Sequence, residues 1–265
     1  MDRTYPRLVG DIGGTNARLA WVAAPGAAPE GVRTYACAQH ASLADVIRTY
    51  FQEERRPRPP WAAIGIANPV VGDRVQMTNH HWAFSIEEMR QGLGLERLLV
   101  LNDFTTLAMS LPSLTSEDLR QVGGGQAVAG APRALLGPGT GLGVSGLLWS
   151  DNGKLVPVNG EGGHVTLAAA TDREADVLSR LRQRFGHVSA ERALSGPGLV
   201  NLHDALCELE GVAPPSLTPA EVAEAALAGR DGRCEEALEL FCSFLGNVAG
   251  NLALTLGARG GVYIG

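Results

Sequence analysis

Two glycine-rich segments and a small set of polar residues have the types and spacing that could do chemistry. The first segment reads Gly10-Asp11-Ile12-Gly13-Gly14-Thr15-Asn16. Glycines let a tight turn bring backbone N–H groups close to phosphate oxygens, because no Cβ stands in the way. Thr15 and Asn16 add side-chain donors, and Asp11 can hold a magnesium ion through water. We interpret this segment as a phosphate-binding turn, and an ordinary hairpin turn is the alternative.

The second segment reads Gly137-Pro138-Gly139-Thr140-Gly141-Leu142-Gly143 and lies between two apolar runs. Its central residues, Gly139, Thr140 and Gly141, again combine backbone freedom with a hydroxyl donor. Alone, this pattern fits a plain turn as well as an anion-binding loop. Two such loops, each between two predicted strands, suit two halves of a protein that hold one polyphosphate.

Three further groups of polar residues are candidates for catalysis or binding. Asn102-Asp103 follows the apolar run Leu98–Leu101, and ligands collect beyond the carboxyl ends of strands in α/β sheets. An Asx turn that caps the next helix is the alternative use of both residues. Glu161 and His164 flank a glycine pair, which alone is typical of a turn. Glu191 lies at a predicted helix start, where a solvated carboxylate is common.

The elements that must position these groups alternate between strands and helices. Apolar runs predict strands at 8–12, 17–22, 32–37, 62–67 and 98–101, with helices beginning after Ser42 and Ser85 as N-caps. Further strands are expected at 134–136, 144–149, 155–158 and 261–264, and further helices at 172–186, 198–210, 219–228 and 234–256. We therefore predict a small α/β domain over residues 1–110 and a larger α/β domain over residues 111–265.

Composition excludes several classes of protein. The formal net charge is −6, which disfavours an extended nucleic-acid interface. Lys154 is the only lysine and lies in a predicted hairpin turn, so a P-loop or a Schiff-base mechanism does not fit. We see neither a run of about 18 uninterrupted apolar residues nor a signal-peptide pattern, so we expect no membrane partner and a cytoplasmic location. The four cysteines form no C-x-x-C pair and are expected to be reduced.

Taken together, the motifs closely resemble the bacterial glucokinase family. The residues that carry the resemblance are Leu8–Leu19, Ile66–Pro69, Met77–His80 with Phe84-Ser85, Asn102–Phe104, Gly137–Gly143, Glu161–His164, His187–Arg192 and Leu194–Leu199. They are long, occur in the family's order and span the chain. They match the proteobacterial ATP-dependent type within the hexokinase and actin-like ATPase superfamily.

The resemblance implies a two-domain actin-like ATPase fold, related to ribonuclease H, with the active site in the interdomain cleft. It implies transfer of phosphate from ATP to glucose, with Mg²⁺ and without zinc. It assigns Gly10–Thr15 to the nucleotide phosphates. It assigns Asn102, Asp103, Glu161, His164 and Glu191 to the sugar, with Asp103 as general base. The related group that carries a zinc-binding cysteine cluster after its sugar-binding histidine does not fit, because Val165–Ala168 stands there.

The family continues beyond the segment that corresponds to Gly261–Gly265, through an adenosine loop and further helices. We therefore expect a C-terminally truncated chain that keeps the sugar-binding groups. We expect it to have little or no glucokinase turnover and to melt at a lower temperature than the full-length form. A sugar-binding protein that has lost turnover is one alternative, and an actin-like assembly ATPase is another. The second alternative has no use for Glu161, His164 and Glu191 near Asp103. The expected partners are a sugar and a nucleotide, and the sequence also allows a homodimer.

Overall fold

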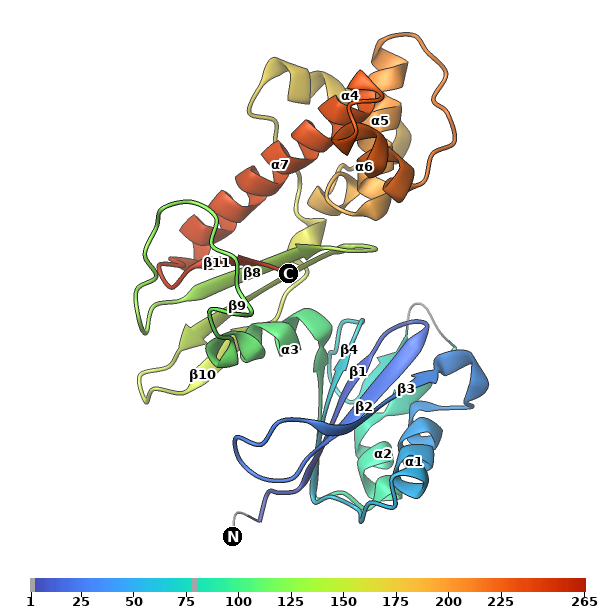
Figure 1. Ribbon diagram of the computed structural model, residues 1–265, viewed down its shortest axis with the longest axis vertical. Coiled ribbons are helices and arrows are strands. Elements are labelled where there is room, and N and C mark those ends of the chain that lie inside the picture. Colours follow the sequence, from blue (N-terminus) through green and yellow to red (C-terminus); the bar gives the residue numbers. More distant parts are fainter. Residues whose placement is uncertain (1–2, 78–80) are drawn as a thin grey trace. The chain divides into compact units, whose positions relative to one another are not determined.

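The computed structural model describes residues 3–77 and 81–265, which form two compact units (Figure 1). The first unit is Met1–Ser110 and the second is Leu111–Gly265. Each unit has its own sheet, its own helices and its own buried apolar cluster. Each unit is therefore described by itself.

The first unit is built on a five-stranded sheet in the order β3-β2-β1-β4-β7. Its strands are β1 (Arg7–Ile12), β2 (Asn16–Val22), β3 (Glu30–Ala36), β4 (Trp61–Ile66) and β7 (Arg97–Asn102). Strands β1, β4 and β7 are parallel, and Ile12, Ile66 and Asn102 lie in register. The segments that follow these three strands consequently leave the sheet at one edge, where Asn102 and the first glycine-rich turn both lie.

Helices α1 (Leu43–Glu53) and α2 (Ile86–Leu93) begin where the sequence predicts. The Ser42 hydroxyl accepts the Asp45 N–H and the Ser85 hydroxyl accepts the Glu88 N–H, which satisfies amides that have no partner within the helix. The two helices contact each other and bury Leu43, Val46 and other apolar residues with one face of the sheet (Figure 1). A two-stranded ribbon, β5 (Arg74–Gln76) and β6 (Ala83–Ser85), precedes α2.

Helix α3 (Asp103–Ser110) follows β7 directly and packs against β4 and β7. A Cβ at Gly65 would lie 2.9 Å from the Thr106 hydroxyl, whereas Ile64 and Ile66 belong to the core with α1 and α2. Because side chains alternate between the faces of a strand, α3 lies on the opposite face of the sheet. A short 3₁₀ helix, η1 (Cys37–Gln39), precedes α1, and η2 (Leu111–Ser113) follows α3.

The second unit contains a four-stranded sheet in the order β10-β9-β8-β11. Its strands are β8 (Arg133–Pro138), β9 (Leu142–Trp149), β10 (Leu155–Val158) and β11 (Val262–Ile264). Neighbours are antiparallel except β8 and β11, which run parallel. The tight hairpin between β8 and β9 places Gly139, Thr140 and Gly141 at its tip.

Four helices complete the second unit: α4 (Asp172–Phe185), α5 (Gly196–Leu209), α6 (Pro219–Leu227) and α7 (Gly232–Leu256). They share a buried cluster that includes Val177, Leu202 and Phe244. Two 3₁₀ turns, η3 (Gly162–His164) and η4 (Ala190–Arg192), lie between β10 and α5. Helix α5 starts two residues before the predicted start, because the Ser195 hydroxyl caps it and Pro197 fits its first turn.

One helix among the described residues, α7, is long and apolar enough to cross a membrane by length and composition alone. Its sequence is not an uninterrupted apolar run, because it contains Ser243, Asn247 and Asn251. A single such helix is weak evidence for a membrane span, since core helices pass the same test. One face of α7 does enter the core, with Phe244 and Ala237 fully buried.

Candidate functional site

The first glycine-rich segment divides between a strand and a turn. Gly10 and Ile12 lie in β1, where a Cβ at Gly10 would lie 2.8 Å from the side chains of Leu19 and Ile64. Ile12 is fully buried in the core, so only its backbone can reach a ligand. The turn itself is closed by the Gly13 N–H, which donates to the Asn16 carbonyl at 2.9 Å. Thr15 and Asn16 are exposed beside it, as a phosphate-binding turn requires.

A buried cysteine, Cys37, forms two hydrogen bonds to the backbone of this turn. The Cys37 N–H donates to the Thr15 carbonyl at 2.8 Å, and its thiol donates to the Gly13 carbonyl with a sulfur–oxygen distance of 3.6 Å. Burial raises the pKa of the Cys37 thiol, so the group stays protonated and available as a donor. The sequence predicts a strand that ends at Cys37, whereas β3 ends at Ala36 and Cys37 begins the 3₁₀ helix η1.

Asn102 ends β7 and Asp103 begins α3, at the edge where the parallel strands end. The Asn102 Oδ1 accepts the N–H groups of Phe104 and Thr105 at 3.0 and 3.2 Å, which makes Asn102 the cap of the helix. Its Nδ2 donates to the Asn68 carbonyl at 3.4 Å. The Asx-cap interpretation of Asn102 is thus confirmed for its side-chain oxygen. The cap fixes the direction in which Asp103 enters the helix.

The carboxyl of Asp103 has a raised pKa. This carboxyl is half-buried, and its pKa lies above the ordinary aspartate value. Desolvation is the larger cause of the increase, and repulsion from Asp11 is a smaller one. The Phe104 N–H, which donates to Asp103 Oδ1 at 2.8 Å, acts in the opposite direction. Asp11 itself is exposed and lies 3.7 Å from Arg18. The first unit therefore places a carboxylate of raised basicity near a second, solvated carboxylate.

In the second unit, Glu161 and His164 occupy one tight turn. The His164 N–H donates to the Glu161 carbonyl at 3.0 Å, and the His164 Nε2 lies 4.0 Å from Glu161 Oε2. Both side chains are more than half exposed. The glycine pair between them packs against β9, since a Cβ at Gly162 would overlap Val144 and a Cβ at Gly163 would overlap the Leu142 carbonyl. The glycines thus allow the turn to lie against the strand.

Glu191 is brought next to this turn by a short antiparallel pairing. Thr166 pairs with Ser189, and the Ala190 N–H donates to the Val165 carbonyl at 2.9 Å. The two 3₁₀ turns that contain His164 and Glu191 consequently contact each other. Glu191 Oε2 accepts the Leu142 N–H at 2.9 Å, directly after the β8–β9 hairpin tip. The second unit therefore assembles Glu161, His164 and Glu191 around the start of β9.

His187, His203 and the cysteines have structural surroundings. His187 Nε2 lies 3.0 Å from the Thr166 hydroxyl, and His203 is fully buried. His80 lies outside the described residues. Cys207 and Cys234 are buried, Cys242 is exposed, and all are free thiols. Among residues 3–77 and 81–265, no group of three or more His, Cys, Asp and Glu side chains is arranged to hold a metal ion.

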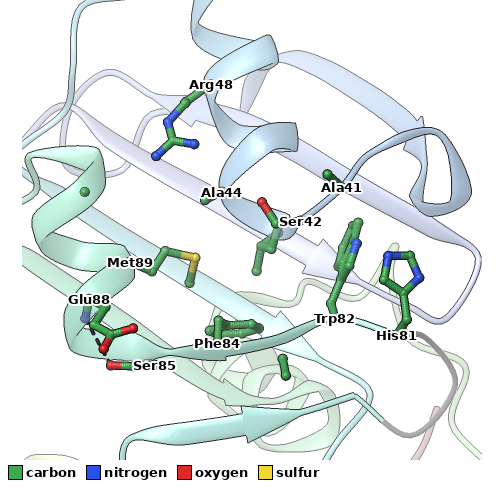
Figure 2. A pocket seen from close by; sticks show the side chains of 13 residues that line it. Ala41, Ser42, Ala44, Arg48, His81, Trp82, Phe84, Ser85, Glu88 and Met89 are labelled. Carbon is green, nitrogen blue, oxygen red and sulfur yellow. Dashed lines mark hydrogen bonds between the residues drawn. The ribbon is translucent and has the colours of Figure 1, made fainter.

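A cavity of about 400 Å³ lies in the first unit between α1, α2 and β6 (Figure 2). Figure 2 shows Arg48, Trp82, Phe84 and Met89 around it, with the Ser85–Glu88 cap at its border. None of the residues predicted to bind sugar or nucleotide lines this cavity. The sequence motifs instead predict the site at the ends of the strands.

A family model and curated relatives match this chain over nearly its whole length. A family model described as Glucokinase matches residues 8–265. A glucokinase of Aromatoleum aromaticum is 59% identical over 263 residues, which are 99% of this chain and 79% of the relative. A glucokinase of Chromobacterium violaceum is 54% identical over 265 residues, which are 100% of this chain and 76% of the relative.

Solved structures agree on the fold. A glucokinase from an Antarctic psychrotroph has a TM-score of 0.89 and 36% identity, over 98% of this chain and 82% of that chain. The glucokinase of Balamuthia mandrillaris in complex with glucose has a TM-score of 0.72 and 22% identity, over 98% of this chain and 79% of that chain. A glucokinase of the ROK family from Streptomyces griseus with glucose and AMPPNP has a TM-score of 0.61 and 18% identity, over 98% of this chain and 83% of that chain.

The motifs, the fold and the relatives lead to the same assignment. The expected actin-like ATPase fold is confirmed by neighbours that include ROK-family sugar kinases. The match extends over nearly the whole chain, and its identity to the curated relatives exceeds half of the aligned residues. This chain therefore belongs to the glucokinase family.

Proposed function

We propose that this chain phosphorylates D-glucose at the expense of ATP and yields glucose 6-phosphate. The observation that carries the proposal is the match of residues 8–265 to the glucokinase family. Phosphoryl transfer needs little covalent help from a protein, so positioning and neutralisation of charge dominate. Such an activity would serve glycolysis in the cytoplasm.

Asp103 is the proposed general base. A base must take a proton from the primary hydroxyl of the sugar as that oxygen attacks the γ-phosphorus. Its raised pKa supports this role, because a carboxylate that binds a proton more readily accepts it more readily in the transition state. Asn102 aligns it through the helix cap and is also proposed to contact the sugar through its Nδ2.

The phosphates of ATP are assigned to two turns. The Gly10–Asn16 segment of the first unit offers its turn amides and the Thr15 and Asn16 side chains, and the Gly139–Gly141 tip of the second unit offers Thr140. The Asp11 carboxylate is exposed and lies 3.7 Å from Arg18, so it is accessible to Mg²⁺ held through water. Bound there, Mg²⁺ would neutralise phosphate charge.

Glu161, His164 and Glu191 are proposed to hold the other sugar hydroxyls. Hydrogen bonds to charged groups contribute about 1.5–3 kcal/mol each, so each loss predicts about a 10- to 150-fold weaker affinity. We expect Glu161→Gln, His164→Ala and Glu191→Gln to raise the KM for glucose by this order, and to change the KM for ATP far less.

Steady-state kinetics with each substrate varied in turn would measure both constants. Glu117→Gln, an exposed carboxylate in the same unit, is the matched control and should leave both constants unchanged. A variant with normal glucose affinity and weakened ATP affinity would show that its residue binds the nucleotide instead.

The hydrogen bond from Cys37 to the first glycine-rich turn gives a separate prediction. Cys37→Ala removes the thiol donor to the Gly13 carbonyl and should raise the KM for ATP by about three- to tenfold with little change for glucose. Cys234→Ala, at an equally buried cysteine of the other unit, is the control. Equal ATP constants in the two variants would mean that the thiol does not position the turn.

The metal requirement is a further prediction. We expect turnover to depend on Mg²⁺ and to withstand zinc-selective chelators, because the sequence lacks the cysteine cluster of the zinc-binding group. Elemental analysis of the purified protein and a chelator series would test this. Stoichiometric zinc would contradict the prediction.

A further inference from the structure

The peptide of Leu142 joins the two kinds of site in the second unit. Leu142 is the first residue of β9, directly after the Gly139–Gly141 tip. Its N–H donates to Glu191 Oε2 at 2.9 Å, and its carbonyl lies against Gly163 within the Glu161–His164 turn. The backbone of Leu142 therefore contacts both segments assigned to the sugar, while the tip before it is assigned to phosphate.

The other end of the tip is held by the same segment. The Gly139 carbonyl accepts the N–H of Gly196, the first residue of α5, at 2.8 Å. The Ser195 hydroxyl, which caps α5, donates to the Glu191 carbonyl at 2.9 Å. The segment from Glu191 to Gly196 thus contacts the hairpin tip at both ends, by a side chain at one end and by backbone at the other.

A carboxylate can accept bonds at two oxygens, and Glu191 uses one of them for the Leu142 N–H. A hydroxyl that donates to this carboxylate would fix its rotamer, and with it the Leu142 peptide. Close packing also links Glu191 to the hairpin tip, because a Cβ at Gly141 would overlap the Glu191 carboxylate. The position of Glu191 and the conformation of the tip therefore depend on each other.

We propose that Glu191 couples sugar binding to the conformation of the Gly139–Gly141 phosphate turn. The proposal rests on the proposed function, since it takes Glu191 as a sugar ligand. Glucose bound to Glu191 orders the turn through the Leu142 N–H before nucleotide chemistry begins. By thermodynamic linkage, a ligand in the turn strengthens glucose binding by the same factor.

The test is a titration of the full chain, labelled with ¹⁵N, with glucose alone. We expect the amide resonances of Gly141 and Leu142 to shift, with the dissociation constant that calorimetry gives for glucose. The amide of Gly153, in the β9–β10 hairpin, is the internal control and should not move. Glu191→Gln should still bind glucose at higher concentration, but its Leu142 amide should shift by less than half as much.

A second pair of variants tests the same coupling by adding a methyl group to the turn, with the charge of Glu191 unchanged. Gly141→Ala should weaken glucose binding by about fivefold or more, although the residue is assigned to phosphate. Gly139→Ala, in the same turn with open space around its Cβ, should leave the glucose dissociation constant within about twofold. In a Glu191→Ala background, Gly141→Ala should add nothing, because the group it displaces is gone.

The outcomes separate the inference from the function. Wild-type protein that binds no glucose in calorimetry would overturn the proposed function and this inference together. Glucose binding with an unmoved Leu142 amide, or with equal effects of Gly141→Ala and Gly139→Ala, would overturn the inference alone. Additive effects of Gly141→Ala and Glu191→Ala would have the same meaning.

Discussion

Asp103→Asn should reduce turnover by about 10²- to 10⁴-fold, the usual contribution of a positioned base, while glucose binding stays within about tenfold. The substitution keeps the size of the side chain but removes its negative charge and its ability to take a proton. Coupled assays for kcat and calorimetry for glucose would measure the two quantities. Asp151→Asn, in the exposed β9–β10 hairpin, is the control. Near-normal turnover would remove Asp103 from this role.

The pH dependence supplies an independent readout of the same residue. Because the pKa of Asp103 is raised, kcat/KM should fall on acidification at a pH above the ordinary aspartate range. Repulsion from Asp11 contributes to that shift, so Asp11→Asn should move the acidic limb to lower pH, whatever its effect on the maximal rate. An unmoved limb would mean that Asp103 does not set it.

Stability should change in the opposite direction to activity. A carboxyl whose folded pKa lies above its unfolded pKa contributes stability at low pH that is lost as pH rises through the folded pKa. At neutral pH the charged Asp103 therefore costs stability, and Asp103→Asn should melt at a higher temperature than the wild type. The difference should vanish in acid, where both side chains are neutral.

Gly163→Ala is expected to have the largest effect on the second unit. The new Cβ would overlap the Leu142 carbonyl, a backbone atom that cannot move aside without displacing β9. Overpacking of this kind costs about 1–3 kcal/mol, which corresponds to a melting temperature lower by roughly 2–12 °C. The turn that carries Glu161 and His164 would also move, so the KM for glucose should rise by about tenfold or more.

Gly160→Ala is the matched control, since it lies three residues earlier and a Cβ there meets open space. Differential scanning fluorimetry and steady-state kinetics on the two variants would measure both effects. If Gly163→Ala matched Gly160→Ala in melting temperature and in glucose KM, the close packing of this turn on β9 would be neither structural nor functional.

Local signals in the sequence determined much of this protein. Ser42 and Ser85 cap α1 and α2 as predicted, because capping depends on residues only three positions apart. The alternation of strands and helices predicted most elements with small differences at their ends, but it did not predict the β5–β6 ribbon. The long motifs gave the family, which the relatives confirm. The roles of Asp103, Glu161, His164 and Glu191 remain predictions from those motifs.

The tertiary structure alone decided which groups support the motif residues. Cys37 lies 24 residues from Gly13, and Glu191 lies 49 residues from Leu142, so no local pattern links either pair. Gly10 belongs to the first glycine-rich motif, yet its lack of a Cβ is explained by the packing of Leu19 and Ile64. The raised pKa of Asp103 likewise depends on burial. Burial and contacts between distant residues arise only when the chain has folded, because strand pairing and helix packing bring those residues together.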